Sequence, residues 1–353
     1  MPTNPPSTAA GREATAFWAT APCQSELRIE ALPSPAPGEA LVRTLFSGIS
    51  RGTELLVHRG TVPPAVAHLM RAPFQQGEFP FPVKYGYLSV GVVERGPDHL
   101  LGRRVFCLHP HQDSYVVPTT ALTVIPDEVP SDRAVLTGSV ETAINALWEC
   151  APRFGDRVAV VGAGAIGGSL AALLRRFPLA RLQLVDPDPA KGTVAAALGV
   201  EWALPQDAMQ ECDIVYHASA TEDGLAGGLA QLGDEGDLVE LSWYGTHSPR
   251  VPLGLDFHAR RLRIRGSQVG AISAARRARR THADRLALAV AALADPSFDA
   301  LLGGTAAFAD LPRVMESLCQ GSLSGMCQVI AYPEHAVGSA DLPRTEPSTM
   351  KRG

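Results

Sequence analysis

The stretch that most constrains the fold is a short apolar run followed by three spaced glycines. Val158–Val161 has the composition of a buried strand, and Gly162, Gly164 and Gly167 come directly after it. Ala165–Arg176 then has the apolar spacing of an amphipathic helix. A strand that turns through glycines straight into a helix is typical of a parallel βαβ unit, so this stretch predicts an α/β fold.

The same glycine spacing predicts a phosphate site. Gly162 permits a tight turn, Gly164 lets the backbone approach a ligand, and Gly167 allows the helix to pack closely on the strand. The helix begins at Ala165 and Ile166, where free N–H groups and the positive end of the helix dipole attract phosphate. We therefore predict that these five residues bind the pyrophosphate of a dinucleotide.

The acidic residue after the next strand indicates which dinucleotide binds. Leu182–Val185 reads as a second strand, and Asp186 ends it, 19 residues after Gly167. A carboxylate at this distance accepts hydrogen bonds from the adenosine ribose and repels the 2′-phosphate of NADP. The sequence predicts NAD, with NADP less favoured and a nucleotide-free fold of the same type as the alternative.

Composition excludes several classes of partner. The 353 residues are 46% hydrophobic and 19% charged, which suits about two globular domains. The net charge of −5 gives no reason to expect nucleic acid or an anionic membrane as a partner. No apolar run approaches the ~20 residues that span a bilayer.

The ends and the cysteines predict a cytoplasmic protein. Met1–Thr15 is polar and lacks the apolar core of a signal peptide, so we expect a disordered lead-in. The six cysteines are scattered without a Cys-x-x-Cys motif, which predicts reduced, mostly buried thiols.

The pattern of secondary structure changes near residue 140. Before it, short strand-like runs punctuated by Gly and Pro predict a β-rich domain, and Thr61–Pro82 is a long irregular excursion. After it, strands and helices alternate to residue 268, which predicts a doubly wound parallel sheet. A helix over Ala274–Ala294 and a closing strand over Cys327–Tyr332 follow, and residues 334–353 are expected to be disordered.

This order of parts resembles the medium-chain dehydrogenase/reductase family. Besides the glycine loop, the motifs that carry the resemblance are Pro37-Gly-Glu-Ala-Leu-Val-Arg, Ser47-Gly-Ile-Ser-Arg-Gly-Thr-Glu54, Gly86-Tyr-Leu-Ser-Val-Gly-Val-Val-Glu94 and Gly102-Arg-Arg-Val. The resemblance implies a GroES-like catalytic domain over residues 1–140, a Rossmann NAD-binding domain over 141–268 and a return segment over 269–333 that completes the catalytic domain. It also implies a homodimer that pairs through the sheet edge at Leu262–Ser267.

The chain departs from the zinc-dependent branch of this family at each ligand position. That branch has Gly-Ile-Cys where this chain has Gly48-Ile49-Ser50, and Gly-His-Glu where it has Gly86-Tyr87-Leu88; the third position falls on Gly138 or Ser139. The cysteine lobe of a structural zinc is also absent, since the short stretch from Cys107 to Tyr115 occupies its place. Zinc binds Cys, His or carboxylate ligands, so we predict neither a catalytic nor a structural zinc.

Within the family, the pairing of the Ser-Gly-Ile-Ser motif with Gly-Tyr is most similar to the zinc-less hydroxyethyl bacteriochlorophyllide dehydrogenase branch. That branch oxidises a secondary alcohol on a tetrapyrrole side chain to an acetyl group. The resemblance bears on the type of reaction more than on the substrate.

Without zinc, side chains must handle the proton on the alcohol oxygen. Tyr87 holds a ligand position, so we predict that it is the acid/base, with Lys84 as a cation that lowers its pKa; the alternative is that Tyr87 only lines the pocket. Ser50 is predicted to relay a proton or to be an ordinary loop serine. His109, or His111 two residues on, is predicted to face the substrate, because alternate residues of a strand share one side. Together with Cys107 they lack a fourth metal ligand, so no metal is predicted there.

The resemblance places further residues at the cofactor and the substrate. Lys191 is expected beside the adenosine ribose, and Thr142 and Ser242 near the nicotinamide. His58, Lys84 and Trp243 are expected at the substrate. The arginines between Arg260 and Arg280 form either a solvent-facing surface or a patch that attracts an anionic substrate.

Together these observations predict a zinc-independent, NAD-dependent oxidoreductase. It would transfer a hydride between nicotinamide and a secondary alcohol or ketone of a small or medium-sized molecule. The alternatives are an NADPH-dependent enone or quinone reductase and a non-catalytic NAD-binding sensor or scaffold.

Overall fold

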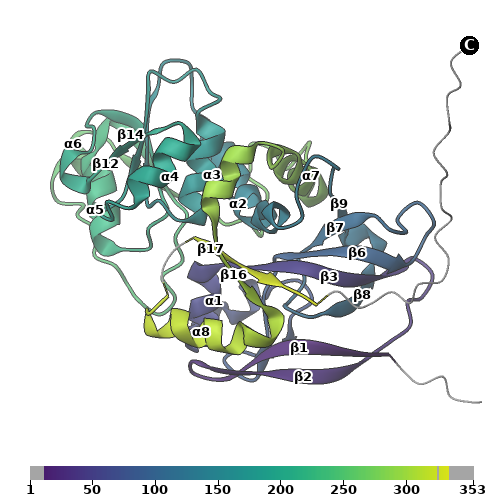
Figure 1. Cartoon of the computed structure of the whole chain (residues 1–353). Coiled ribbons are helices and arrows are strands. Elements are labelled where there is room, and N and C mark those ends of the chain that lie inside the picture. The colour runs from purple at the N-terminus through teal and green to yellow at the C-terminus, as the bar shows by residue number, and fades with distance from the viewer. Residues whose placement is uncertain (1–11, 324–325, 334–353) are drawn as a thin grey trace, which may run out of the picture.

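The computed structural model describes residues 12–323 and 326–333, and its strands form three sheets within those residues (Figure 1). Most of the predicted lead-in and the predicted tail at 334–353 lie outside the described residues. The last four residues of the lead-in are described, and there the prediction of disorder is wrong. Arg12–Ala21 is strand β1, which pairs along its length with the following strand and buries alternate side chains.

The first part of the chain is β-rich, as predicted. A four-stranded sheet has the order β2-β1-β5-β4, and a seven-stranded sheet has the order β16-β17-β3-β6-β7-β9, with β8 paired to β3. The strands of this part are β2 (Gln24–Leu32), β3 (Glu39–Ile49), β4 (Gln76–Gly77), β5 (Val83–Lys84), β6 (Ser89–Arg95), β7 (Arg104–Cys107), β8 (Ser114–Pro118) and β9 (Thr123–Val124). One helix of this part, α1 (Arg51–His58), was not predicted, and it begins inside the Ser-Gly-Ile-Ser motif.

The middle of the chain forms the predicted parallel sheet. Its order is β12-β11-β10-β13-β14-β15, and every pairing in it is parallel. This is the order in which two halves wind outward from a central pair of strands, and such sheets bind dinucleotides where the order reverses. The elements are β10 (Arg157–Val161), α3 (Ala165–Leu174), β11 (Arg181–Val185), α4 (Lys191–Leu198), β12 (Glu201–Ala203), β13 (Cys212–His217), α5 (Glu222–Ala230), β14 (Leu232–Glu240), α6 (Asp256–Ala259) and β15 (Arg263–Gly266).

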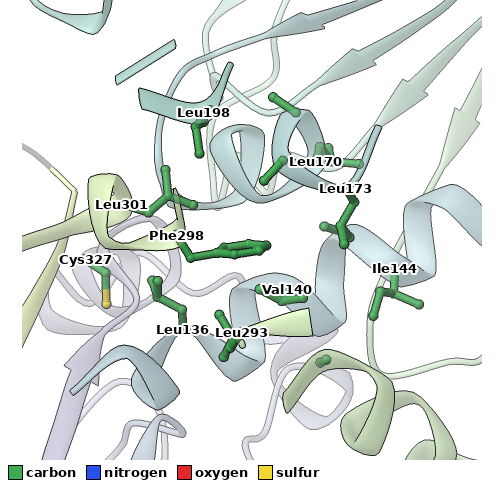
Figure 2. Packing of buried hydrophobic residues seen from close by; sticks show 14 of the residues in the cluster. Leu136, Val140, Ile144, Leu170, Leu173, Leu198, Leu293, Phe298, Leu301 and Cys327 are labelled. Carbon is green, nitrogen blue, oxygen red and sulfur yellow. The ribbon is translucent and has the colours of Figure 1, made fainter. Parts of the chain in front are cut away.

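Two helices connect the sheets. The helix α2 (Thr137–Glu149) leads from the β-rich part into β10, and α7 (His282–Ala292) packs on it. The largest apolar cluster lies where α2, α3 and the turn at Pro296–Leu301 meet, and Figure 2 shows Phe298 in its middle, with Leu173 and Val140 nearby. This shared core holds the parallel sheet against the β-rich part.

The end of the described chain returns to the seven-stranded sheet. The strand β17 (Cys327–Ala331) pairs with β3, and β16 (Leu302–Ala307) pairs with β17, while α8 (Leu311–Gln320) covers them (Figure 1). The segment over 269–333 thus contacts both parts of the chain, since α7 packs on α2 while β16 and β17 join the seven-stranded sheet; its assignment to a catalytic domain stays a prediction. The remaining short turns of 3-10 helix are Pro64–Leu69, Thr119–Ala121, Arg133–Leu136, Pro205–Asp207 and Phe308–Asp310.

Two local predictions are corrected. The helix predicted over Ala274–Ala294 begins eight residues later, at His282, because Thr281 and Asp284 form a capping box that fixes its first turn. The cysteines are not all reduced thiols, since Cys23 and Cys319 form a disulfide between the turn after β1 and helix α8. The two cysteines are 296 residues apart in sequence, so spacing gave no sign of the pair. Among the described residues, no helix is both long and apolar enough to cross a membrane.

Candidate active site and cofactor site

The glycine loop has the geometry of a phosphate cradle. Gly162 has φ +103°, and a side chain there would meet the backbone of Ser219 at 2.8 Å. A Cβ on Gly167 would lie 1.8 Å from the carbonyl oxygen of Gly162, so only glycine permits this approach. A Cβ on Gly164 would meet no described atom within 4 Å, which leaves open space above the half-buried start of α3 at Ala165 and Ile166. The loop therefore fits a bound pyrophosphate.

The carboxylate of Asp186 lies beside this cradle. Its Oδ2 accepts a hydrogen bond from the Ala163 N–H at 2.8 Å, and its Oδ1 accepts one from the Asp188 N–H at 2.9 Å. The predicted ribose acceptor thus sits at the glycine turn. Lys191 opens α4 and places its ammonium 3.4 Å from the sulfur of Met326, a weak acceptor that an anionic or hydroxyl ligand would displace.

A second polar cluster lies at the carboxyl ends of β13 and β14 and was missed. The buried ring of His217 bonds through Nδ1 to both carboxylate oxygens of Glu240, at 2.8 and 3.0 Å, and through Nε2 to Ser219 Oγ at 2.6 Å. The predicted Ser242 belongs to this cluster, because its N–H donates to Glu240 and its hydroxyl accepts from the Ala220 N–H. In the sequence, the signal for this cluster was a histidine at the end of one predicted strand and a glutamate near the end of the next.

Thr142 is placed differently from the prediction. It lies in the second turn of α2, where its hydroxyl donates to the Gly138 carbonyl at 2.9 Å. A hydroxyl bonded back to its own helix is already satisfied. Thr142 therefore contributes to α2 in this structure, and its contact with a cofactor stays a prediction.

The three positions that hold zinc in the related branch come together here. The hydroxyl of Tyr87 donates to Ser50 Oγ at 2.7 Å, across 37 residues of sequence. A Cβ on Gly138 would lie 3.9 Å from the Tyr87 ring and 2.4 Å from the end of the Leu88 side chain, and Ser139, the other candidate for the third position, is buried. The site thus holds a serine hydroxyl and a phenol where zinc would need Cys, His or carboxylate.

Tyr87 does not have the cation predicted for it. Burial and the nearby Glu54 carboxylate raise the pKa of Tyr87 to about 12, although its hydrogen bonds with Ser50 and Thr53 oppose this rise. Lys84 is 1% exposed and pairs with Glu30 at 2.7 Å, where burial lowers the pKa of its ammonium. The prediction that Lys84 lowers the pKa of Tyr87 is wrong, and a buried, paired ammonium does not meet a substrate. Lys84 lies instead in β5, between β1 and β4 of the four-stranded sheet, and its side chain reaches Glu30 of β2.

An apolar wall stands beside Tyr87. Tyr87 and Trp243 pack on the same buried cluster, which is built on Val57, Val62 and Tyr85. The predicted irregular excursion folds onto this cluster too, through Ala67, Ala72, Phe79 and Phe81. The chain after β14 reaches α1 at Gly245, where a Cβ would meet Leu56 at 2.9 Å. Trp243 therefore shares an apolar cluster with Tyr87, and its contact with a substrate stays a prediction.

His109 is a neutral core residue. Its ring stacks on Tyr115 with centroids 3.8 Å apart, and its Nδ1 bonds to the Pro110 carbonyl at 2.9 Å. Burial lowers the pKa of His109 to about 3. The strand β7 ends at Cys107, so the predicted alternation breaks down and His111 turns elsewhere. Catalysis by His109 finds no support in this position.

The low pKa of His109 predicts acid sensitivity. Below the ordinary histidine pKa of 6.5 the unfolded chain binds a proton that the folded chain does not bind, down to about pH 3. Over that window the free energy of unfolding falls by about 1.4 kcal/mol per pH unit on account of this residue. Urea unfolding at about pH 6 and about pH 5 measures the fall. His109→Phe, which keeps the stack on Tyr115, should flatten the dependence, and the exposed His99→Gln should not; equal slopes in all three proteins would contradict it.

His111 and Glu54 form a buried pair that the motifs did not reveal. His111 Nε2 lies 2.9 Å from Glu54 Oε2, and the side chains are 1% and 3% exposed. Glu54 Oε1 accepts the Ser50 N–H at 2.7 Å, which ties the pair to the site. Glu54 was visible as the last residue of the Gly-Thr-Glu motif, but its partner lies 57 residues away.

His58 lies one turn after Glu54 on α1. It is 1% exposed, and its ring lies 6.3 Å from that of Phe17, beside a small cavity that Met315 also lines. Burial lowers the pKa of His58. The structure therefore does not support its predicted contact with a substrate, because the unpredicted helix α1 turns it toward α8.

The arginines separate into two groups. Arg260, Arg263 and Arg265 are ion-paired, chiefly with Glu211, Asp234 and Asp237, so this group is a paired surface. The second group is exposed in the turns before α7 and consists of Arg276, Arg277, Arg279 and Arg280. Binding of an anionic substrate at these residues stays a prediction, and the apolar cluster on which Tyr87 packs includes none of them. Among the described residues, no cluster of three or more His, Cys, Asp or Glu side chains is arranged to hold a metal.

Comparison with known proteins agrees with this fold. No family model matches the chain. The 2-desacetyl-2-hydroxyethyl bacteriochlorophyllide A dehydrogenase of Rhodobacter capsulatus is 28% identical over 235 residues, which cover 61% of this chain and 69% of that protein.

Two solved structures show the same fold at low identity. A short chain alcohol dehydrogenase from Escherichia coli CFT073, in complex with NADH, is 16% identical with a TM-score of 0.71 and covers 91% of this chain and 100% of its own. The L-idonate 5-dehydrogenase of Escherichia coli is 14% identical with a TM-score of 0.74, over 91% and 99%. With the strand order and the glycine cradle, these likenesses show that the chain has the fold of these dehydrogenases, in keeping with its resemblance to the medium-chain dehydrogenase/reductase superfamily.

Proposed function

We propose that the chain is an NAD-dependent oxidoreductase that acts on a secondary alcohol or ketone without zinc. The observation that carries this proposal is the hydrogen bond between Tyr87 and Ser50, because it joins two hydroxyls where the related branch binds the metal. When bound, NAD supplies the carbon that accepts or gives the hydride. The chain would hold it through Gly162–Gly167, Asp186 and Lys191.

Three hydroxyls at the site, those of Thr53, Tyr87 and Ser50, are linked in a row by hydrogen bonds. Thr53 hydrogen-bonds to Tyr87, and the Tyr87 hydroxyl donates to Ser50 Oγ. Within residues 12–323 and 326–333, Tyr87 is the only partner of Ser50 Oγ, so the hydrogen of Ser50 remains available. Ser50 would therefore donate to the substrate oxygen, and Tyr87 would polarise Ser50.

This arrangement gives Tyr87 a different role from a freely ionising acid. Because the pKa of Tyr87 is raised to about 12, its phenol stays neutral near pH 7. A neutral hydroxyl can stabilise the negative charge that develops on the substrate oxygen by hydrogen bonding, while it keeps its own proton. The proton must then be exchanged with another group.

The surroundings of Tyr87 also bear on the substrate. The wall formed by Tyr85, Trp243, Phe79 and Phe81 is apolar and aromatic, while Lys84 is paired with Glu30 on the far side of β5. We propose that the substrate is an uncharged molecule with an apolar body next to its alcohol or ketone carbon. This differs from the anionic substrate that the arginines between Arg260 and Arg280 left open.

A turnover assay, run before and after removal of metal ions, tests this function. The protein is given NAD or NADP with a panel of secondary alcohols, ketones and one enone, before and after dialysis against a chelator. We expect reduction of NAD by an apolar secondary alcohol, at a rate that the chelator does not change. Activity lost on chelation and restored by zinc would contradict the zinc-free mechanism, and enone reduction with NADPH alone would favour the other reductase class.

Asp186 is expected to set the preference for NAD. Asp186→Ser should lower the ratio of the NADP to the NAD dissociation constant by about 10- to 100-fold, because it removes a charge that repels the 2′-phosphate. Serine keeps an oxygen that accepts from the loop N–H groups. Titration calorimetry with both dinucleotides measures the ratio, and the exposed Asp188→Ser is the control. An unchanged ratio in Asp186→Ser would mean that another residue selects the cofactor.

A further inference from the structure

The turn after β14 carries Trp243 from the parallel sheet to the apolar wall beside Tyr87. Trp243 is half-buried and packs on the same cluster as Tyr87, whereas the other residues of the wall belong to the β-rich part. We propose that Glu240 is a positioning residue for Trp243 and that, through Trp243, it sets how large an apolar body the substrate can carry. The inference rests on the function proposed above.

The carboxylate of Glu240 accepts hydrogen bonds on both sides of Trp243. The N–H of Ser242 donates to Oε1 at 2.7 Å, and the hydroxyl of Tyr244 donates to Oε2 at 3.3 Å. Burial and the Glu240 carboxylate raise the pKa of Tyr244, so its hydroxyl keeps the proton that it donates. The residues before and after Trp243 are thus bonded to one side chain, which restricts the backbone that carries the indole ring.

Glu240 is itself held by His217. The ring of His217 is fully buried, and its Nδ1 lies 3.0 and 2.8 Å from the two carboxylate oxygens of Glu240. We assign the hydrogen of the ring to Nδ1, because a carboxylate only accepts. A carboxylate bonded through both oxygens to one donor has a fixed orientation, so His217 sets the direction in which Glu240 meets the turn.

The chain that follows β13 fixes His217. Its Nε2 lies 2.6 Å from Ser219 Oγ, which lies 2.8 Å from Thr221 Oγ1, and Thr221 caps the helix α5. A Cβ on Gly224 would lie 2.9 Å from His217 Nε2, so the approach of α5 to the ring requires glycine there. His217 therefore anchors Glu240 to the interior of the parallel sheet.

Beyond Trp243 the turn meets α1 of the β-rich part. Gly245 has φ +62°, and a Cβ there would lie 2.9 Å from Leu56 and 2.9 Å from the carbonyl oxygen of Thr61. Trp243 thus lies between a fixed point in the parallel sheet and the helix that borders the hydroxyls of the site. Because a misplacement of about 1 Å can cost about 100-fold in rate, the hold of Glu240 on the turn bears on turnover.

An apolar wall discriminates substrates by size. One methylene in an apolar pocket changes specificity by about 10- to 200-fold. Glu240→Leu removes the acceptor for Ser242 and Tyr244, so Trp243 should pack less firmly on a large substrate. We expect the ratio of kcat/KM for α-methylbenzyl alcohol to that for isopropanol to fall by about tenfold or more, through a higher KM for the larger alcohol. The KM for isopropanol and the Kd of NAD⁺ should stay unchanged.

Three variants make this test specific. Glu240→Gln keeps an acceptor for the Ser242 N–H and gains an amide that can donate to the Tyr244 hydroxyl, so it should keep the wild-type ratio. Asp237→Leu is the matched control, because it removes another carboxylate of β14, 12% exposed against 16% for Glu240, which pairs with two arginines instead of the turn. Tyr244→Phe removes one of the two hydrogen bonds beside Trp243, so it should lower the ratio by less, and it serves if Glu240→Leu does not fold.

A double variant separates positioning from any other role of Glu240. Trp243→Leu should lower the ratio at least as much as Glu240→Leu does, and adding Glu240→Leu to it should lower the ratio no further. The alternative is an effect on the cofactor, because Ser219, which bonds His217, lies 2.8 Å from the place of a Cβ on Gly162 in the glycine loop. Titration calorimetry with NAD⁺ would then show a raised Kd in Glu240→Leu.

Fluorine NMR follows Trp243 without any substrate. The chain has four tryptophans, so the protein labelled with fluorotryptophan should give four signals, and Trp243→Phe identifies one of them. In Glu240→Leu the Trp243 signal should shift and broaden, because the turn has lost two of its hydrogen bonds. In Glu240→Gln and Asp237→Leu the same signal should stay in place.

The outcomes separate the two proposals. Absence of turnover with every alcohol overturns the proposed function and the control of specificity with it, while the Trp243 signal still tests the positioning. An unmoved Trp243 signal in Glu240→Leu overturns the positioning. An unchanged alcohol ratio, an equal fall in Asp237→Leu, a raised Kd of NAD⁺, or a further fall when Glu240→Leu is added to Trp243→Leu overturns the inference and leaves the proposed function standing.

Discussion

Tyr87→Phe is expected to slow hydride transfer by about 10²- to 10⁴-fold and to leave NAD⁺ affinity unchanged. The change removes one hydroxyl and keeps the ring that packs on Val57 and Tyr85. Without the phenol, Ser50 loses its only described donor and the charge on the substrate oxygen loses its stabilisation. The measurement is the single-turnover rate with the best alcohol of the panel, beside NAD⁺ titration.

Two further variants make this prediction specific. Tyr85→Phe is the matched control, because its hydroxyl donates to the Met70 carbonyl at 3.4 Å and lies in the same cluster. Ser50→Ala should lose rate as Tyr87→Phe does, and the double variant should lose little more, because residues that act as a unit are not additive. Wild-type turnover in Tyr87→Phe would show that Tyr87 only lines the pocket.

Arg285→Met is expected to lower the free energy of unfolding by about 3 to 5 kcal/mol. Arg285 is fully buried, and its guanidinium donates to Glu141 Oε1 at 3.0 Å, to Asn145, and to the carbonyls of Val269 and Ala271. Methionine fills much of the volume but leaves the Glu141 carboxylate buried without its cation. Burial already raises the pKa of Glu141 even with Arg285 in place.

Urea unfolding compares this variant with an exposed pair. Arg250 is 92% exposed and bonds Glu222 at 2.8 Å, so Arg250→Met should cost far less stability than Arg285→Met. The double variant Arg285→Met with Glu141→Leu should recover part of the loss, because it removes the orphaned carboxylate. A loss as small as that of Arg250→Met would mean that water reaches Glu141.

The fold was predictable wherever one local signal carried it. The glycine spacing after Val158–Val161 requires close backbone approaches, and the structure shows them at Gly162 and Gly167. The parallel sheet follows from alternating strands and helices. The predicted start of the helix α7 was wrong because the capping residue Thr281 sets where that helix begins. The helix α1 was missed because it is only eight residues long.

The candidate site was predictable only in part. That Ser50, Tyr87 and Gly138 meet followed from a resemblance, and the structure brings them together. The role given to Lys84 failed because β5 turns its side chain toward Glu30. His58 and His109 looked available in sequence, but both are buried away from solvent.

The sequence by itself determined the α/β class, the glycine cradle with Asp186 and the replacement of the zinc ligands. Each of these depends on residue type and short spacing. Only the tertiary structure decided which distant side chains are hydrogen-bonded, since His111 and Glu54 lie 57 residues apart and Ser47 and Tyr332 lie 285 apart. The reason is physical: hydrogen bonds and desolvation depend on distance and burial, which the packing of β3, α1 and β17 sets.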